Sequence, residues 1–471
     1  MTMKNNKVDV GAVIDSAGFF WMPCGIALMM IVIMLADGFD LFIMGYIADP
    51  LVADFGITRG DLGPVNSAGL IGMAIGSVLL GWLGDRVGRK RAYVSCLSLL
   101  FLGSLICYFS SNLDILITGR LIMGFGLGGI TPLATTLVSE WTNKNIRSVV
   151  VAAVIVAIPL GGALGGLISG PVLESGGWRG MFLVGSMVPL AMFVLFSFLL
   201  PESPKYLAKH PELHKRLAHT LNRLLGENRF DGTEEFVVVE AGKRSSHWFS
   251  TLWNTDFRAR TTFIWTAFAI NSFVLYVFTN YLPTLLTNSG LEAGTSRMGL
   301  TVFSGGAALG SVGGALFINW FGSKYVGTIL AAVGGLATAA LAMLLLVDNV
   351  ANPSLLAACL VAGASINGMQ AFLYAVSAHS YPTEIRASAV GMAQTFSRIG
   401  AVASPWAATF YFKMDPAPPV SMFLFAIAGV IVLTVTSFFL IPTHIPSNSR
   451  KMVELEEEDA LRHGVGVSPP E

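Results

Sequence analysis

The sequence contains little charge for its size. Only 12% of its 471 residues are Asp, Glu, Lys or Arg, whereas 54% are hydrophobic. A soluble globular domain carries roughly 25% charged residues, so the composition excludes an ordinary soluble protein. Because long apolar stretches recur along the whole chain, they indicate many membrane-spanning helices and not one large core.

Signatures of catalysis, metal binding and ATP use are also missing. The chain has no G-x-x-x-x-G-K-[ST], no H-E-x-x-H and no G-x-S-x-G. Residues 124–129 match G-x-G-x-x-G, but no strand precedes them and they lie in an apolar run, so they predict no dinucleotide site. Only four cysteines are present, all in or beside apolar runs, which favours neither disulfides nor a metal site. We therefore expect no enzyme, no cofactor, no metal and no nucleic-acid partner.

Twelve long apolar runs account for most of the chain. A transmembrane helix needs about 20 apolar residues, and six runs of that length lie on either side of a polar interval. They cover residues 25–47, 62–83, 92–111, 115–138, 148–170, 180–200, 261–286, 297–318, 326–347, 355–379, 388–411 and 420–441. The sequence predicts an all-α integral membrane protein with twelve transmembrane helices in two six-helix bundles.

The distribution of positive charge predicts the orientation of these helices. With the N-terminus inside, the inward segments hold 23 Lys and Arg and the outward loops hold 4. Cytoplasmic loops are enriched in these residues, so both termini are predicted to be cytoplasmic. The N-terminus shows no cleavable signal peptide. The predicted parts are a cytoplasmic N-terminus (1–24), a first bundle (25–200), a cytoplasmic central loop (201–257), a second bundle (258–441) and a cytoplasmic tail (442–471).

The central loop contains one amphipathic helix. Leu213, Leu217, Leu221 and Leu225 recur every four residues, with basic residues between them. Such a helix lies on the inner membrane surface or packs on the protein, and the sequence leaves both alternatives open.

The two halves resemble each other weakly, as in transporters built from internal repeats. GWLGDRVGRKR (81–91) aligns with NWFGSKYVGT (319–328). The first of these segments resembles the loop 2–3 signature of the major facilitator superfamily. GRLIMGFGLGG (119–129), PESPKYL (201–207) and YPTEIRASAVG (381–391) support the same resemblance. It implies the major facilitator fold and alternating access to a site between the halves.

Four further segments resemble the aromatic acid:proton symporters of that superfamily. They are DGFD (37–40), GLGGITPLATTLVSEW (126–141), NYLPTLL (280–286) and TFSRIGAVASP (395–405). The resemblance implies a monomeric symporter that imports a benzoate-like or hydroxybenzoate-like carboxylate with protons, through the lipid bilayer of a bacterial inner membrane. Two alternatives remain: a symporter of another organic acid, such as lactate, sialate or a dicarboxylate, and a transporter-like sensor that moves nothing.

Four charged residues lie inside the predicted spans: Asp37, Asp40, Arg120 and Arg398. Each charge at mid-bilayer depth costs roughly 2.5–3.5 kcal/mol unless it faces a watery cavity or a partner. Asp37 and Asp40 are three residues apart and share one helix face. We expect Arg120 to pair with Asp40, which favours the ionised form of that acid. The deeper and less compensated Asp37 is then predicted to carry the coupling proton. The alternative is a purely structural role, in which an Asp–Arg pair locks the first and fourth spans together.

Arg398 has no acid in the spans of its own half, and a guanidinium can grip a carboxylate through two parallel hydrogen bonds. We assign it to the substrate carboxylate, although a packing role is an alternative and Arg120 is a rival for the same task. An aromatic ring also needs apolar walls with a few polar anchors. The candidates for these are Asn271, Tyr276, Asn367, Gln370 and Tyr374.

The resemblance implies that loop 2–3 latches the inner gate. Its candidate gating residues are Gly81, Asp85, Arg86, Gly88 and Arg89. Glu140 with Arg147 is predicted to form a second latch, and Glu384 with Arg386 occupies the corresponding place in the second half. In the aligned loop of the second half, Ser323 stands where the family usually has an acid. Asp85 is therefore the single acid at this position of the two loops. Topogenic positive charge alone would explain the bases, but not the acid or the glycines.

Overall fold

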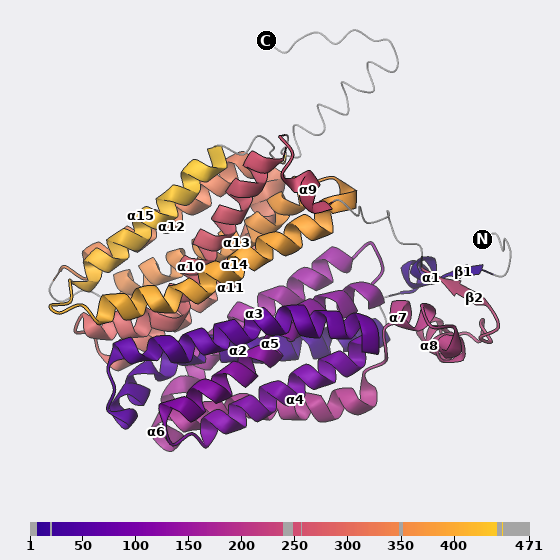
Figure 1. Cartoon of the computed structure of the whole chain (residues 1–471), viewed down its shortest axis with the longest axis horizontal. Helices are drawn as coiled ribbons and strands as arrows, with labels where there is room; N and C mark the ends of the chain where they lie inside the picture. The colour runs from indigo at the N-terminus through magenta and orange to yellow at the C-terminus, as the bar shows by residue number, and fades with distance from the viewer. Residues whose placement is uncertain are drawn as a thin grey trace, which may run out of the picture. The chain divides into compact units, whose positions relative to one another are not determined.

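The structure of the protein is a computed structural model that describes residues 7–18, 21–238, 248–255, 257–347, 352–439 and 445. The described residues are mostly helical (Figure 1). They form two compact units: unit 1 is Met1–Lys243 with Tyr276–Ser304 and Val402–Pro418, and unit 2 is Arg244–Leu275 with Gly305–Ala401 and Pro419–Glu471. Most of the predicted tail, 442–471, lies outside the described residues, as do 239–247 and 256 of the central loop.

Five long helices make up most of unit 1. They are α2 (Trp21–Phe55), α3 (Leu62–Val87), α4 (Arg89–Tyr108), α5 (Leu113–Trp141) and α6 (Arg147–Leu199). α3 packs on α5, α2 packs on α6, and α4 contacts both α5 and α6. α6 bends at Gly177, whose φ of 61° is not helical. Its two arms therefore correspond to the fifth and sixth predicted spans.

Glycines let α2 and α6 approach each other at backbone distance. A Cβ on Gly38 of α2 would lie 1.8 Å from the carbonyl oxygen of Ile158 on α6. In return, a Cβ on Gly161 of α6 would lie 1.9 Å from the carbonyl oxygen of Leu35 on α2. Small residues are used in this way where membrane helices associate closely.

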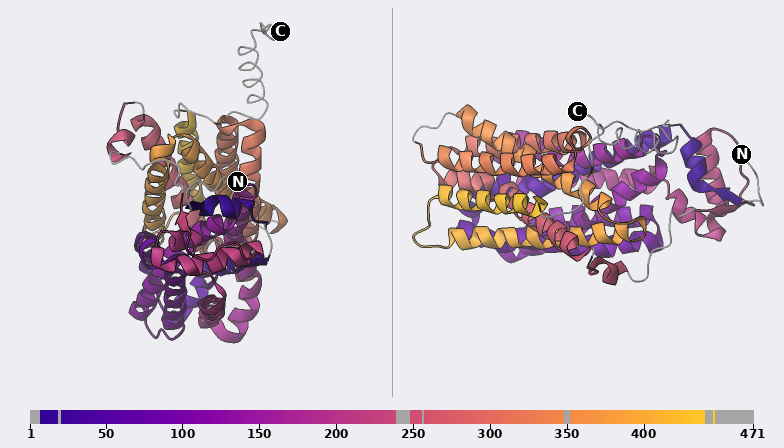
Figure 2. Two further views of the ribbon diagram at one scale, coloured as in Figure 1. Left: turned by 90° about the vertical axis from the view of Figure 1, so that its right-hand side faces the viewer. Right: turned by 90° about the horizontal axis from the view of Figure 1, so that it is seen from above.

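A small polar subdomain lies at one end of the unit 1 helices, where the indigo N-terminal segment meets the magenta central loop (Figures 1 and 2). It contains β1 (Lys7–Asp9), α1 (Val10–Ser16), α7 (Pro204–Ala208), η2 (Pro211–Leu213), α8 (His214–Leu225) and β2 (Glu235–Val237). β1 and β2 pair in parallel, with Lys7 opposite Glu235. The N-terminal segment and the central loop are thus joined in one structure.

α8 is the amphipathic helix of the central loop. Leu217, Leu221 and Leu224 are buried in the protein, and α8 packs against α7. A helix that lay on a membrane surface would leave this apolar face uncovered by protein. Of the two alternatives left open by the sequence, the structure shows the packed helix.

Three helices contribute residues to both units. They are α10 (Arg258–Asn288), α11 (Ala293–Phe321) and α14 (Thr383–Phe412), and unit 1 takes them from Tyr276, up to Ser304 and from Val402, respectively. Unit 1 also contains the short η1 (Arg59–Asp61). The compact units therefore do not coincide with the predicted bundles 25–200 and 258–441, whose boundaries remain a prediction.

Unit 2 contains the remaining parts of those three helices and four further helices: α9 (Trp248–Leu252), α12 (Ser323–Leu344), α13 (Asn352–His379) and α15 (Val420–Phe439). α12 packs against both α13 and α15. Trp265 of α10 stacks on Phe396 of α14, with ring centroids 4.4 Å apart.

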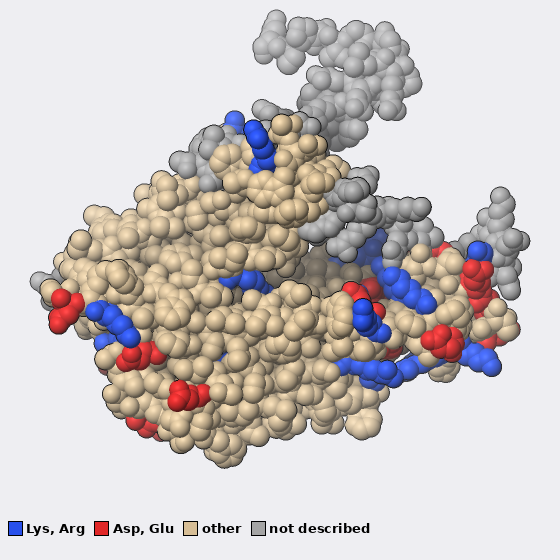
Figure 3. Space-filling view, in the orientation of Figure 1, with Lys and Arg blue, Asp and Glu red and all other residues tan. Residues whose placement is uncertain are grey.

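The helices have the composition expected of membrane spans. In the described part of the chain, nine are long and apolar enough to cross a membrane, and one of these includes both arms of α6. Each of the twelve predicted runs falls on a described helix, although the count of twelve spans remains a prediction. On the face shown in Figure 3, the flanks of the unit 1 helices are almost free of charge, and Lys, Arg, Asp and Glu gather near the helix ends.

Candidate functional site

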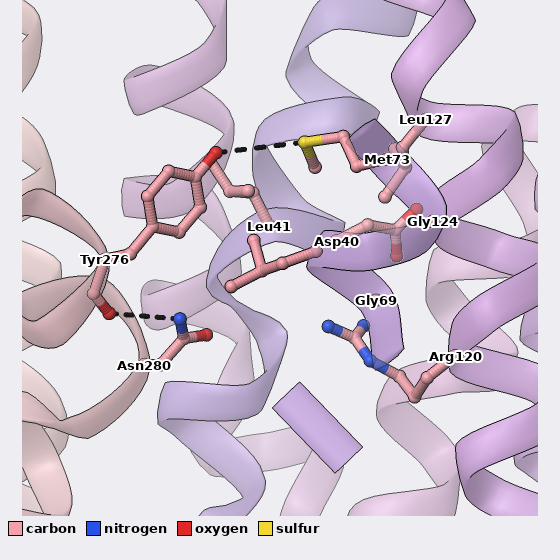
Figure 4. A pocket seen from close by; sticks show the side chains of 10 residues that line it. Asp40, Leu41, Gly69, Met73, Arg120, Gly124, Leu127, Tyr276 and Asn280 are labelled. Carbon is pink, nitrogen blue, oxygen red and sulfur yellow. Dashed lines mark hydrogen bonds between the residues drawn. The ribbon is translucent and has the colours of Figure 1, made fainter. Parts of the chain in front are cut away.

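A narrow pocket in unit 1 brings two of the intramembrane charges together. Its lining comes from α2, α3, α5 and α10 and consists of Asp40, Leu41, Gly69, Leu70, Met73, Arg120, Gly124, Leu127, Tyr276 and Asn280 (Figure 4). The cavity measures about 10 Å³, which is room for roughly one water molecule. An aromatic acid could enter only after the surrounding helices had moved apart.

Arg120 of α5 supplies the positive charge of the pocket. Its side chain is 5% exposed, and its Nε and Nη1 have no hydrogen-bond partner among the described residues. The guanidinium lies against Gly69 of α3, where a Cβ would come within 3.0 Å of Nη2. A glycine at this position therefore makes the space that Arg120 occupies.

Asp40 of α2 supplies the negative charge. It is fully buried, and neither carboxylate oxygen has a hydrogen-bond partner in the described part of the chain. A Cβ on Gly185 of α6 would lie 2.8 Å from Oδ1, so the carboxyl group is held between α2 and α6. The predicted ion pair with Arg120 is not formed in this structure. The two residues line one pocket, but their side chains point in different directions (Figure 4).

Asp37 lies three residues before Asp40 on α2 and is also buried. Thr131 of α5 donates a hydrogen bond from Oγ1 to Oδ2 of Asp37, at 3.1 Å. The sequence had not singled out Thr131, although it belongs to the segment GLGGITPLATTLVSEW that carries part of the family resemblance.

Two residues of α10 complete the pocket. Tyr276, a predicted substrate-binding residue, places its ring at the wall and donates a long hydrogen bond to Sδ of Met73, at 3.8 Å. Asn280 donates from Nδ2 to the carbonyl oxygen of Tyr276, at 3.0 Å. Its amide and the guanidinium of Arg120 approach the pocket from opposite sides (Figure 4). Asn280 was missed as a site residue, although it opens the segment NYLPTLL.

The other predicted substrate-binding residues lie in unit 2. Asn271 of α10 donates to Oε1 of Gln370 on α13, at 2.7 Å. Asn367 donates to the carbonyl oxygen of Gly363 on its own helix, at 3.4 Å. Tyr374 is 38% exposed and packs edge-on against Phe268, and Arg398 is half-buried. Their roles in substrate binding remain predictions.

The predicted gate of loop 2–3 is built around the first turn of α4. Asp85 forms an ion pair with Arg89, at 2.6 Å. Glu202, from PESPKYL, accepts a hydrogen bond from the backbone N–H of Lys90, at 3.0 Å, and so places its charge at the positive end of α4. Gly88 has a φ of 103°, and a Cβ there would lie 2.3 Å from Oε2 of Glu202. Position 88 therefore requires glycine for two reasons.

Glu140 and Arg147, predicted to form a second latch, contact different partners. Glu140 accepts a hydrogen bond from the hydroxyl of Ser203, at 2.5 Å. Arg147 forms an ion pair with Asp15 of α1, at 3.2 Å. Both residues thus connect loop 4–5 to the polar subdomain, and the gating role of each remains a prediction.

Among the described side chains, the matching loops of unit 2 show fewer charged contacts. Arg386 donates from Nε to the carbonyl oxygen of Tyr381, at 3.3 Å, whereas the side chain of Glu384 lies outside the described residues. Ser323, which replaces the acid, exchanges two hydrogen bonds with Ile445: the backbone N–H of Ser323 donates at 2.9 Å and its hydroxyl accepts at 2.7 Å. Position 323 therefore binds the backbone of Ile445.

Comparison with known proteins places the chain in a family. The family model described as Major Facilitator Superfamily matches residues 20–405. The chain is 35% identical to the 4-hydroxybenzoate transporter PcaK of Acinetobacter baylyi, over 86% of this chain and 88% of that protein. It is 32% identical to the gallate transporter of Pseudomonas putida, over 84% of this chain and 87% of that protein.

The fold agrees with this comparison. The solved structure of the xylose transporter XylE from E. coli is similar with a TM-score of 0.70 at 16% identity, over 90% of this chain and 97% of that one. The fold and family expected from the sequence are confirmed. The protein belongs to the Major Facilitator Superfamily and is a multi-pass membrane transporter, not an enzyme.

Proposed function

We propose that the protein is a proton-coupled symporter that imports an aromatic carboxylate, of the benzoate or hydroxybenzoate kind, by alternating access. The proposed membrane is a bacterial inner membrane, with both termini in the cytoplasm. Two of its relatives are named for transport of 4-hydroxybenzoate and gallate, both of which are aromatic carboxylates.

One observation carries the proposal: a buried guanidinium with unused donors faces the same pocket as a buried carboxyl group that has no hydrogen-bond partner among the described residues. Buried polar groups are normally hydrogen-bonded, and intramembrane charges are functional by default. The unused donors Nε and Nη1 of Arg120 lie on different edges of its guanidinium. The group can therefore hold a substrate carboxylate on one edge and still interact with Asp40 on another.

The rest of the pocket suits an aromatic acid. Tyr276, Met73 and Leu127 supply flat or adaptable apolar walls, and Asn280 supplies a polar group opposite Arg120. Such a combination of apolar walls with few polar groups is typical of small-molecule sites. Arg120 thus becomes the first candidate for the substrate carboxylate, ahead of Arg398.

Proton coupling follows from the proximity of like charges. A substrate anion bound by Arg120 would lie beside Asp40, and the repulsion between the two anions favours uptake of a proton by the aspartates. By reciprocity, a bound proton then favours binding of the anion. Asp37, three residues away on the same helix, is proposed to exchange this proton with the solution.

The test is transport in proteoliposomes that contain the purified protein. Uptake of labelled 4-hydroxybenzoate is measured with and without an imposed pH gradient, in competition with benzoate, protocatechuate, phenylpropionates, muconate and lactate. We expect accumulation that requires the gradient and competition by the aromatic acids. Preference for lactate or muconate would assign the protein to the transport of another organic acid. Uptake that does not depend on the pH gradient would exclude proton coupling. Absence of counterflow would indicate a sensor and not a transporter.

A further inference from the structure

We infer that Thr131 is a positioning residue that sets the pH at which Asp37 exchanges the coupling proton. The inference depends on the proposed function, because it assigns a task to a partner of the proposed proton carrier. It starts from the hydrogen bond between α5 and α2, in which Oγ1 of Thr131 donates to Oδ2 of Asp37 at 3.1 Å.

The direction of this bond is unusual for a threonine in a helix. A helical threonine commonly donates to the carbonyl oxygen one turn earlier on its own helix. On α5, Thr118 does so to Asp114, at 2.8 Å, and Thr135 does so to Thr131, at 3.0 Å. Thr131 instead donates to a carboxylate on a neighbouring helix. The hydroxyl of Thr131 therefore connects two helices, which a hydroxyl bonded to the carbonyl oxygen of its own helix would not do.

A hydroxyl group next to a carboxyl group responds to its protonation. It donates to the ionised form and can accept a hydrogen bond from the protonated form. Donation to the carboxylate favours the ionised form, and removal of the donor makes that form harder to reach in a buried site. Asp37 is only 5% exposed, so water replaces the lost donor poorly.

Other ionisable groups near Asp37 act on its charge. In the described part of the chain they include Asp40 on α2, Arg120 on α5, which interacts with Asp40, and Tyr93 on α4. Asp40 interacts electrostatically with both Asp37 and Arg120, and Tyr93 interacts electrostatically with Asp37. A change at Thr131 leaves the charge of all three groups intact. Its effect can therefore be separated from a general change in the charge of the site.

The experiment compares three variants of the full chain in proteoliposomes. Thr131→Val keeps the shape of the side chain and removes the hydroxyl, and Thr131→Ser keeps the hydroxyl. Thr135→Val is the matched control, since the hydroxyl of Thr135 donates to carbonyl oxygens of its own helix, α5. Proton-driven accumulation of 4-hydroxybenzoate is measured against pH, and substrate exchange without a gradient is measured beside it.

We expect Thr131→Val to move the pH midpoint of accumulation upward by about 0.5–1 unit, the shift that follows from one typical hydrogen bond. The KM for exchange should stay within about twofold of wild type, because Thr131 does not line the pocket. Thr131→Ser should return the midpoint to its wild-type value, and Thr135→Val should leave it unchanged. A wild-type midpoint in Thr131→Val, or an equal shift in Thr135→Val, would overturn the inference.

Two controls separate failure of this inference from failure of the proposed function. If the wild-type protein accumulates no aromatic acid under a pH gradient, the proposed function itself has failed. If Thr131→Val folds too poorly for transport, the inference is tested by infrared titration of the carboxyl stretch in Thr131→Ser and in wild type. The Asp37→Asn variant serves to assign the band of Asp37. A pH midpoint of the Asp37 band that differs between Thr131→Ser and wild type would contradict the inference, because serine keeps the hydroxyl group.

Discussion

The guanidinium of Arg120 rests on Gly69, with Nη2 3.0 Å from the position that a Cβ of residue 69 would occupy. This contact between α5 and α3 fixes where the donors of Arg120 can point. A methyl group on Gly69 would displace the guanidinium by a few tenths of an ångström within the pocket that Tyr276 and Asn280 also line.

We therefore expect Gly69→Ala to raise the KM for the aromatic acid by up to about 10-fold, less than the 100-fold that a misplacement of 1 Å can cost. Gly25→Ala is the control, because a Cβ at position 25 meets nothing within 4 Å. The measurement is the initial rate of counterflow against substrate concentration. Equal KM values in the two variants would show that the position of Arg120 is immaterial to binding.

The two intramembrane arginines make separable predictions. If Arg120 grips the substrate carboxylate, Arg120→Lys should raise the KM by about 10- to 100-fold, since a hydrogen bond to a charged group contributes about 1.5–3 kcal/mol. Arg398→Lys should then change the KM little. A large rise in KM for Arg398→Lys and a small one for Arg120→Lys would instead assign the substrate carboxylate to Arg398, as the sequence alone suggested.

Asp37→Asn removes the proposed proton carrier and keeps its size. We expect this variant to lose accumulation driven by a pH gradient but to retain exchange of internal for external substrate, because exchange needs no net proton movement. Asp114→Asn, an exposed acid in the first turn of α5, controls for the loss of one negative charge. Full accumulation by Asp37→Asn would end its assignment as the carrier.

Gly88→Ala tests the structure of the predicted inner gate. The left-handed φ of 103° at this position and the contact with Glu202 should together cost about 1–3 kcal/mol of stability. The expected result is a lower Tm in detergent. Gly81→Ala should leave the Tm equal or higher, since its Cβ meets nothing within 4 Å and alanine is the better helix former. A wild-type Tm for Gly88→Ala would show that loop 2–3 tolerates another backbone.

Much of the architecture could be predicted because membrane helices are specified locally. Twelve apolar runs, the loop 2–3 signature and a few buried charges are all readable without a partner in space. The contact between Asp37 and Thr131 shows the limit, because these residues are 94 positions apart. Helical periodicity assigns each of them to a face, but it does not say which faces meet.

The two predicted pairs illustrate the same limit. Arg120 and Asp40 were expected to pair because their depths match, yet the guanidinium lies against Gly69 of α3 and the carboxyl group lies against Gly185 of α6. Arg147 was expected beside Glu140, but it forms an ion pair with Asp15, a residue of the N-terminal segment. In both cases the direction of an arginine side chain, Arg120 or Arg147, depends on a neighbouring helix and not on the spacing of residues along the chain.

The amino-acid sequence by itself determined the class of protein, its membrane helices and the charges that those helices must bury. Only the tertiary structure decided that Arg120, Asp40, Tyr276 and Asn280 share one pocket and that α8 packs on protein. The physical reason is that hydrophobic burial depends on composition and period, which are local properties. Hydrogen bonds and ion pairs depend on distances of about 3 Å, which only the packing of distant helices can set.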